Sequence, residues 1–216
     1  MSNRRLTQIL AALQAALPKL ERVGAYANAK NLLGKSQAEL EILVQQGLGI
    51  VYLGLESGND EILSRIDKGA TAAEMVSAVR KAKRAGLLVS IIGILGIGGP
   101  ELSEHHAEQT GQIVSQMDPD YFSMLTLMLV PGTKLHSQWQ SGEFQLLEPE
   151  EMLAELRQVI GHTDGLTQCV FRTNHASNYL PLKGTLPQDK KRLLQTLDAS
   201  LAQGKGALRP ESWRGL

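Results

Sequence analysis

The sequence predicts an α/β fold built on parallel strands, and three observations support this prediction. Four apolar runs of strand length, residues 23–27, 50–55, 88–95 and 121–130, alternate with segments of helical periodicity. None of these runs alternates cleanly between polar and apolar residues, so we expect helices to bury both faces of the sheet. Each run is followed by small, polar or glycine-rich residues, and parallel α/β proteins place their chemistry at such carboxyl ends. The fold is a doubly wound sheet or part of a (β/α) barrel, and the strand ends favour the barrel.

Local signals mark the helices that separate these strands. The first segment of the chain has one apolar face, which predicts a helix before residue 23. Ser36 and Glu39 have the spacing of a capping box, in which each side chain bonds to the backbone of the other residue. Thr71 and Glu74 repeat this spacing. A glycine follows each of the two helical patterns and predicts where the helix ends.

Composition argues against several classes of protein. The 216 residues include 22 Lys plus Arg and 22 Asp plus Glu, a balance that argues against a dedicated nucleic-acid or membrane-surface binder. The longest apolar stretch, residues 87–99, is too short to cross a bilayer. No secretion-signal pattern is present, so we expect a cytoplasmic protein. Cys169 is the one cysteine, which rules out an internal disulfide and cannot by itself hold a zinc ion or an iron–sulfur cluster.

The stretch YLGLESGNDEIL, residues 52–63, contains the first candidate site residue. An apolar strand ends here at Glu56, and a turn and a helical pattern follow. A carboxylate aimed into the mouth of the barrel can accept two hydroxyl hydrogen bonds from a ribose. The alternative is that Glu56 caps the helix that begins near Asn59. Lys68 follows that helix and is either a solvated lysine or a partner for a ligand carboxylate or phosphate.

The stretch GILGIGGPE, residues 93–101, is rich in glycine. Gly96 and Gly98 match a dinucleotide-binding fingerprint, but the third glycine position is occupied by Glu101, which argues against such a site. Two interpretations remain. The segment is a tight turn from strand to loop, or Gly96, Gly98 and Gly99 form a flat surface on which a planar ligand ring can lie.

A dense polar cluster follows Cys169, outside any periodic pattern. Its residues either close turns through their own backbone or line a substrate pocket. The cluster comprises Asn174, His175, Ser177, Asn178 and Tyr179, and Tyr26 and Asn28 add polar groups after the first strand.

Two other pairs of residues are expected to have structural positions. His105 and His106 are adjacent on a predicted helix, whereas a metal-binding pair has i, i+4 spacing, so we expect both on the surface. Met124 and Met128 are expected to fill the core.

Several motifs in order resemble a known family. VYLGLESGNDEIL…DKGAT, AGLLVSIIGILGIGGPE and DPDYFSMLTLMLVPGTKL are similar to the middle and later strands of radical S-adenosylmethionine (radical SAM) enzymes. The segment FRTNHASNYLPLKGTLP resembles the tail of a group described as Fe–S oxidoreductase or coproporphyrinogen-oxidase-like. The resemblance covers essentially the whole chain. It implies a partial radical SAM-type (β/α) barrel and, in the full-length form, reductive cleavage of S-adenosylmethionine (SAM) for radical chemistry on an unknown small molecule.

The resemblance also implies site residues. Glu56 takes the position that contacts the ribose of SAM, and Lys68 has the spacing of a basic residue that meets the methionine carboxylate. The glycine turn matches the strand that packs on the adenine. The implied cofactor-binding residues are Glu56, Ser57, Lys68, Gly96, Gly98 and Gly99, and the substrate candidates are Tyr26, Asn28 and the polar cluster after Cys169.

One departure from the family pattern concerns the cluster. The CxxxCxxC loop that holds the family's [4Fe–4S] cluster is absent, so we expect no metal site and no cluster on this chain. The resemblance implies an amino-terminal truncation that removes the first two family strands. The edge of the strand at 23–27 would then be open to self-association or to a partner strand.

The expected division places a partial barrel core in residues 1–140 and a carboxyl-terminal helical and loop extension, packed on it, in residues 141–216. The alternative to a radical SAM enzyme is a non-catalytic α/β module that binds a nucleotide-like ligand or a partner chain. No nucleic-acid partner is expected.

Overall fold

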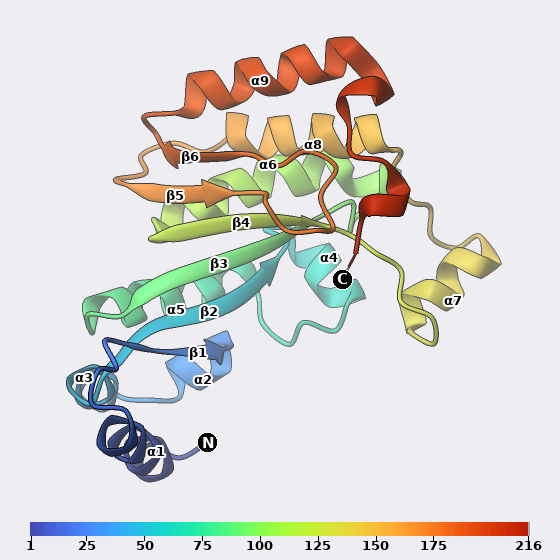
Figure 1. Ribbon diagram of the computed structural model, residues 1–216. Coiled ribbons are helices and arrows are strands. Elements are labelled where there is room, and N and C mark those ends of the chain that lie inside the picture. The colour runs from blue at the N-terminus through green and yellow to red at the C-terminus, as the bar shows by residue number, and fades with distance from the viewer. Residues whose placement is uncertain (216) are drawn as a thin grey trace.

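The computed structural model describes residues 1–215 and contains one six-stranded sheet (Figure 1). The strands lie in chain order, β1 to β6, and the first five run parallel while β6 is antiparallel to β5. The four predicted strands are therefore confirmed as parallel strands, and they lie side by side in chain order. Their bounds are β1 Val23–Ala27, β2 Leu48–Glu56, β3 Leu88–Leu95, β4 Tyr121–Thr126, β5 Cys169–Arg172 and β6 Lys183–Leu186.

Helices connect the strands and cover one face of the sheet. Both predicted capping boxes are confirmed: the Glu39 amide donates to Ser36 Oγ at 3.1 Å, and the Glu74 amide donates to Thr71 Oγ1 at 3.2 Å. The helices are α1 Asn3–Ala16, α2 Ala29–Leu33, α3 Gln37–Gln45, α4 Asp60–Arg65, α5 Ala72–Arg84, α6 Gly99–Met117, α7 Lys134–Ser141, α8 Pro149–Gly161 and α9 Lys190–Gln203, followed by short 3-10 turns at Gly204–Ala207 and Glu211–Trp213. No helix within residues 1–215 combines the length and the apolar character that a bilayer span requires.

The other face of the sheet is open, which contradicts the expectation that both faces are buried. Along β4, Phe122, Met124 and Thr126 are buried against the helices, whereas Tyr121 and Ser123 are only half-buried. Alternate residues of a strand point to opposite faces, so this pattern shows that only one face is packed within the described residues. Because the open face also carries apolar residues, the sequence does not show the polar and apolar alternation that would have predicted an exposed face.

The segment that begins at Cys169 contains two strands that the sequence did not predict. β5 and β6 have only four residues each, and their buried Phe171 and Leu186 complete the core beside β4. The expected division at residue 140 falls inside α7, and β5 and β6 from beyond it continue the same sheet.

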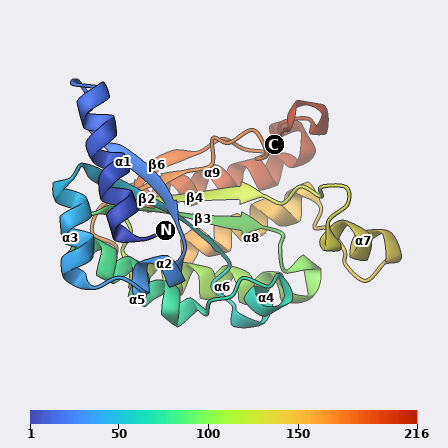
Figure 2. The same ribbon diagram turned by 90° about the horizontal axis from the view of Figure 1, so that it is seen from below.

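At the opposite edge of the sheet, β1 pairs only with β2 among the described residues. Helix α1 packs beside α3 rather than along this edge (Figure 2). Asn3 Nδ2 donates to the Glu39 carbonyl at 3.1 Å, and Gln14 Nε2 donates to the Gln46 carbonyl at 3.0 Å. The outer edge of β1 therefore has no backbone partner from residues 1–215.

Candidate functional site

The Glu56 side chain lies back over its own strand on the open face. Glu56 ends β2 with φ at 60°, and the β2–β3 register shifts between Gly54 and Glu56. This left-handed conformation costs a non-glycine residue about 1–2 kcal/mol. A Cβ atom at residue 54 would overlap Glu56 Oε1, so Gly54 provides the space that the carboxylate occupies. Helix α4 is capped instead by Asn59, whose Oδ1 accepts from the Ile62 amide at 2.9 Å, so Glu56 is not the cap of that helix.

Lys68 meets Glu56 on this face. Its Nζ donates to Glu56 Oε1 at 2.9 Å, and the two side chains are 20% and 21% exposed. The Lys68 amide bonds to the Leu63 carbonyl at 2.9 Å, which holds the residue at the end of α4. The two candidates that the sequence suggested separately thus form one partly buried ion pair beside Gly54.

Ser57 points in the other direction, into a buried network with α6. Its hydroxyl pairs with His106 Nδ1 at 2.8 Å and accepts from the Asn59 amide at 3.0 Å. The Gly58 amide donates to Thr110 Oγ1 at 2.9 Å. This network holds the turn after Glu56 against α6, so Ser57 stabilises the position of Glu56 from the packed side of the sheet.

The expectation that both histidines lie on the surface is wrong for His106, which is fully buried, whereas His105 is exposed. Burial lowers the pKa of His106 to about 4, so the ring is neutral near pH 7. The partner of His106 is far away in the sequence, at Ser57, and no local pattern indicated the pairing.

The glycine turn after β3 is packed rather than open. A Cβ atom at Gly96 would overlap Met152 Cε, and one at Gly98 would lie 2.8 Å from Ile62 Cδ1. Gly99 is likewise buried, with the Gln145 carbonyl 3.1 Å from its Cβ position. The interpretation as a flat open surface is therefore wrong, because side chains from other elements fill it, and the tight-turn interpretation describes the geometry.

Glu155 on α8 is a site-supporting residue that sequence reasoning missed. It is 3% exposed, and its Oε1 accepts from the Gly96 amide at 2.6 Å. Ser103 Oγ donates to its other oxygen, and His106 Nε2 lies 3.6 Å from Oε1. Burial raises the pKa of Glu155 to about 7. His106 thus contacts the end of β2 through Ser57, and Glu155 contacts the end of β3 through the Gly96 amide.

An apolar cavity of about 340 Å³ opens at the ends of β3 and β4. It lies between the end of α4 and the segment that follows β4. Strand β4 ends at Thr126, four residues before the strand end predicted at residue 130. Met124 is buried as expected, but Met128 lines this cavity instead of filling the core. The other lining residues are Arg65, Ile66, Asp67, Ile97, Leu129, Val130, Thr133, Lys134, Leu135 and Gln138.

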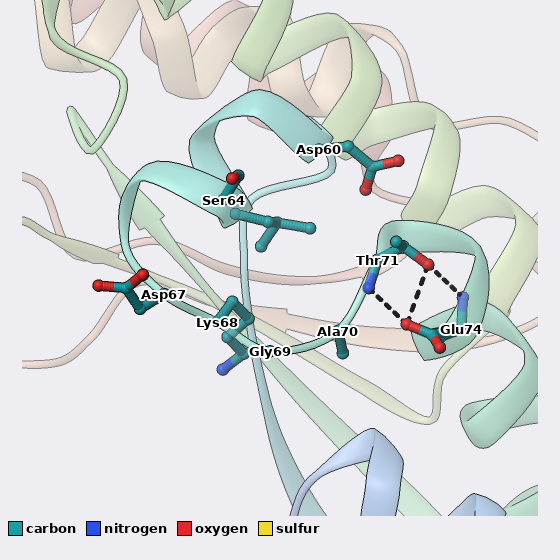
Figure 3. A pocket seen from close by; sticks show the side chains of 9 residues that line it. Asp60, Ser64, Asp67, Lys68, Gly69, Ala70, Thr71 and Glu74 are labelled. Atoms are coloured by element: carbon teal, nitrogen blue, oxygen red, sulfur yellow. Dashed lines mark hydrogen bonds between the residues drawn. The ribbon is translucent and has the colours of Figure 1, made fainter.

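A neighbouring hollow of about 410 Å³ lies between α4 and α5 (Figure 3). Figure 3 shows Glu74 turned toward Thr71, whose amide donates to Glu74 Oε2 at 2.8 Å. These groups are occupied in capping α5. Asp67 and Lys68 point away from them (Figure 3), so the hollow adds no new cluster of ligand groups to the Glu56–Lys68 pair.

A third cavity, of about 590 Å³, lies over the centre of the open face. It brings together three of the substrate candidates, Tyr26, Asn174 and His175, with Tyr52 and Arg172, which the sequence did not single out. The Tyr26 ring is 87% exposed, and its centroid lies 5.5 Å from that of Tyr52. The remaining lining residues are Ser90, Ile92, Ser123, Met124, Leu125 and Ala176.

The other substrate candidates have structural partners. Asn28 caps α2 by accepting from the Asn31 amide at 2.8 Å. Asn178 is buried and donates to the Met124 carbonyl at 2.9 Å, which ties the loop to β4.

Ser177 and Tyr179 are also buried. The Ser177 hydroxyl accepts from the Thr126 amide at 3.3 Å. The Tyr179 hydroxyl donates to Glu211 Oε2 at 2.7 Å, and the Arg214 guanidinium stacks 4.0 Å from its ring centroid. Burial raises the pKa of Tyr179 to about 12. These contacts tie the loop to β4 and to the carboxyl-terminal segment, so distant parts of the chain hold these three residues in place.

Comparison with known proteins identifies the family. Residues 2–112, half of the chain, match the sequence model of the Radical SAM superfamily. The chain belongs to the radical SAM superfamily. The fold agrees with this radical SAM assignment: Elp3 of Methanocaldococcus infernus aligns with a TM-score of 0.59 at 19% identity, covering 87% of this chain and 42% of that one. Coproporphyrinogen III oxidase HemN of Escherichia coli, a radical SAM enzyme, aligns with a TM-score of 0.59 at 13% identity, covering 100% and 56%.

Curated relatives match this radical SAM chain over part of their own length. The tRNA uridine(34) acetyltransferase of Methanocaldococcus infernus is 25% identical over 79% of this chain and 32% of its own. The heme chaperone HemW of Bacillus subtilis is 21% identical over 74% of this chain and 42% of its own. The chain therefore spans less than half of the length of each of these two relatives.

The residues present fit one radical SAM cofactor and not the other. SAM carries a ribose diol, a carboxylate and an adenine, and the chain offers Glu56, Lys68 and the apolar cavity beside Ile97 at adjacent strand ends. A [4Fe–4S] cluster is held by thiolates. Cys169 is buried on the helix side of β5, and burial raises the pKa of its thiol to about 12. Within residues 1–215 no three His, Cys, Asp or Glu side chains gather as metal ligands, so this part of the chain does not fit the cluster.

Proposed function

We propose that this chain supplies the SAM-binding part of a radical SAM enzyme. The observation that carries the proposal is the strained Glu56 backbone, which places the carboxylate over Gly54 and against Lys68. Strained conformations persist where the surrounding structure holds them and are concentrated at functional sites. Family membership supplies the ligand class that such a carboxylate would meet.

Each group has one role in this proposal. Glu56 accepts hydrogen bonds from the two ribose hydroxyls, and Lys68 donates to the methionine carboxylate while keeping its bond to Glu56. Ile97 and Leu129 exclude water from the adenine ring in the apolar cavity. When bound, SAM supplies a sulfonium whose reductive cleavage gives a carbon radical for hydrogen abstraction. Because Cys169 does not fit the cluster, the cysteines that hold it come from outside this sequence.

The cavity over the open face is the proposed substrate site. Tyr26, Asn174 and His175 line it, and it lies on the same face of the sheet as Glu56. The substrate is a small molecule, because the cavity of about 590 Å³ has the size of an ordinary ligand site.

Titration calorimetry with S-adenosylhomocysteine, which has the same ribose and carboxylate, tests the proposal on the 216-residue chain. Without the cluster we expect a dissociation constant on the order of 1 mM. Glu56→Ala removes the charged acceptor and weakens binding by about 1.5–3 kcal/mol. Glu41→Ala, on an exposed position of α3, is the matched control and leaves binding unchanged. Equal affinity in the wild type and Glu56→Ala would remove Glu56 from the site.

The non-catalytic alternative predicts a different ligand preference. A general nucleotide-binding module would bind adenosine and S-adenosylhomocysteine equally, because it would make no use of the carboxylate that only S-adenosylhomocysteine carries. The present proposal expects Lys68→Gln to weaken binding of S-adenosylhomocysteine while leaving adenosine binding unchanged, since adenosine lacks the methionine carboxylate.

A further inference from the structure

One row of residues crosses the open face from the Glu56–Lys68 pair to a pair of cations. The register joins Gly54 to Ile92, Ile92 to Ser123, Ser123 to Arg172 and Arg172 to Lys183. Neighbouring strands lie about 4.8 Å apart, so Arg172 stands about 14 Å from Gly54 along this row. The two ends of the row thus carry different charged groups on one continuous surface.

Arg172 and Lys183 are two cationic residues on neighbouring strands, and no carboxylate forms an ion pair with either side chain within residues 1–215. They are directly opposed on the antiparallel strands β5 and β6, which places both side chains on the same face, and both residues are exposed. Within residues 1–215 neither side chain has a hydrogen-bond or ion-pair partner, and the hydrogen bond from Arg192 to Lys183 goes to the Lys183 backbone carbonyl. By contrast, Arg192 pairs with Asp189 at 3.1 Å on the helix side. Like charges in such a position destabilise a sheet, and a bound anion offsets that cost.

The cavity over the open face reaches Arg172, and Lys183 stands beside Arg172 on the next strand. Arg172 lines it together with Ser123, Asn174 and His175, which supply polar groups at the same end. The His175 ring is held in place because its Nδ1 pairs with Ser177 Oγ at 2.9 Å. The opposite wall is aromatic and apolar, and it is formed by Tyr26, Tyr52 and Ile92. The cavity therefore has a polar end that includes the Arg172 cation and an apolar end.

We propose that Arg172 and Lys183 bind an oxyanion of the substrate, a carboxylate or a phosphate. The apolar or aromatic part of the same molecule lies over Ile92 and Tyr52, on the side that faces Glu56 and Lys68. The guanidinium of Arg172 gives two parallel hydrogen bonds to such a group, and the Lys183 ammonium adds a point charge. That this ligand is a substrate rests on the proposed function, whereas the anion site itself does not.

Nuclear magnetic resonance titration of the 216-residue chain tests the site with three probes of similar size. Phenyl phosphate and benzoate carry an oxyanion, and benzamide is the neutral control. We expect saturable shifts at Arg172 Nε and at the Ser123 amide with one or both anions, weakening with added salt, and none with benzamide. The anion that binds more tightly assigns the substrate to phosphates or to carboxylates.

Variants distinguish specific binding of the anion at Arg172 and Lys183 from its general attraction to basic residues on the surface. The double variant Arg172→Gln and Lys183→Gln weakens anion binding by about tenfold or more. Lys191→Gln, at an exposed position of α9 on the other side of the sheet, leaves it unchanged. Unchanged affinity in the double variant, or no saturable shift at Arg172 in the wild type, would overturn the proposal. The double variant keeps the wild-type affinity for S-adenosylhomocysteine, whose proposed contacts are at Glu56 and Lys68, so failure of the SAM site and failure of the anion site are distinguishable.

Discussion

At the scale of single residues, the position of Glu56 depends on a residue without a side chain. The carboxylate occupies the space above Gly54, and Lys68 Nζ lies 3.0 Å from where a Cβ atom of residue 54 would be. Gly54 itself has no positive φ, so its role is to provide space rather than an unusual backbone conformation. Binding at this site should therefore respond to a change that leaves both charged residues present.

Gly54→Ala tests this dependence. The new methyl group displaces the ends of two flexible side chains, so we expect a change in melting temperature of only a few degrees. The same displacement separates Glu56 from its ligand position, and we expect affinity for S-adenosylhomocysteine to fall about as far as in Glu56→Ala. Gly161→Ala, where the Cβ position is open, is the control. Wild-type affinity in Gly54→Ala would contradict the packing argument.

The buried carboxyl of Glu155 predicts a pH dependence of stability. Burial raises its pKa to about 7 in the folded protein, whereas an unfolded glutamate has a pKa of about 4.3. The folded state holds the extra proton between these values, so this group's stability contribution is present at low pH and is lost as pH rises through about 7. His106 has the opposite effect. Because burial lowers its pKa to about 4, the unfolded state binds a proton more readily than the folded state, so acid reduces the stability of the fold.

Glu155→Gln isolates the glutamate. We expect the melting temperature of the variant, relative to the wild type, to rise between about pH 5 and pH 7 and then to level off, because over that range the unfolded wild type releases a proton that the folded state keeps. Glu104→Gln, at an exposed position of α6, shows no such trend. A pH-independent difference between Glu155→Gln and the wild type would show that Glu155 is not protonated in the folded state.

At the scale of elements, β1 is the part of the sheet with an unpaired edge among the described residues. Its pairing with β2 satisfies the amides on one side only, and α1 packs on α3 instead of along the strand. Exposed strand edges template association with other chains. We propose that this edge is where a partner strand or a second copy of the chain pairs.

Hydrogen exchange tests the edge. We expect fast exchange of the outward amides of Val23–Ala27 at low protein concentration, and slower exchange where the chain self-associates. The central strand β3 is the internal control, because both of its edges are paired. Slow, uniform protection of β1 in a demonstrated monomer would contradict the open-edge description.

The elements also show which features sequence reasoning could predict. The capping boxes were predictable because their partners are three residues apart, and the four longer strands because their apolar runs are continuous. β5 and β6 were not, since four residues carry too little pattern. The packed glycine turn was misinterpreted because Met152 and Ile62, which fill it, come from distant helices. Glu56 and Lys68 were predictable as candidates, but their contact depends on Gly54.

At the scale of the whole molecule, the sheet has one packed face and one open face, and the proposed sites lie on the open face or at its carboxyl-end rim. The proposed SAM groups lie at the ends of β2 to β4, and Arg172 stands about 14 Å from Gly54 across the strands. Cys169 lies on the packed face, away from both sites. This layout leaves the open face free for the proposed SAM and substrate sites.

A crystal structure of the 216-residue chain with S-adenosylhomocysteine tests the central claim most directly. The account predicts ribose hydroxyls within hydrogen-bond distance of Glu56, the ligand carboxylate at Lys68, and adenine in the apolar cavity beside Ile97 and Leu129. Ligand bound elsewhere, with Glu56 still paired only to Lys68, would contradict it.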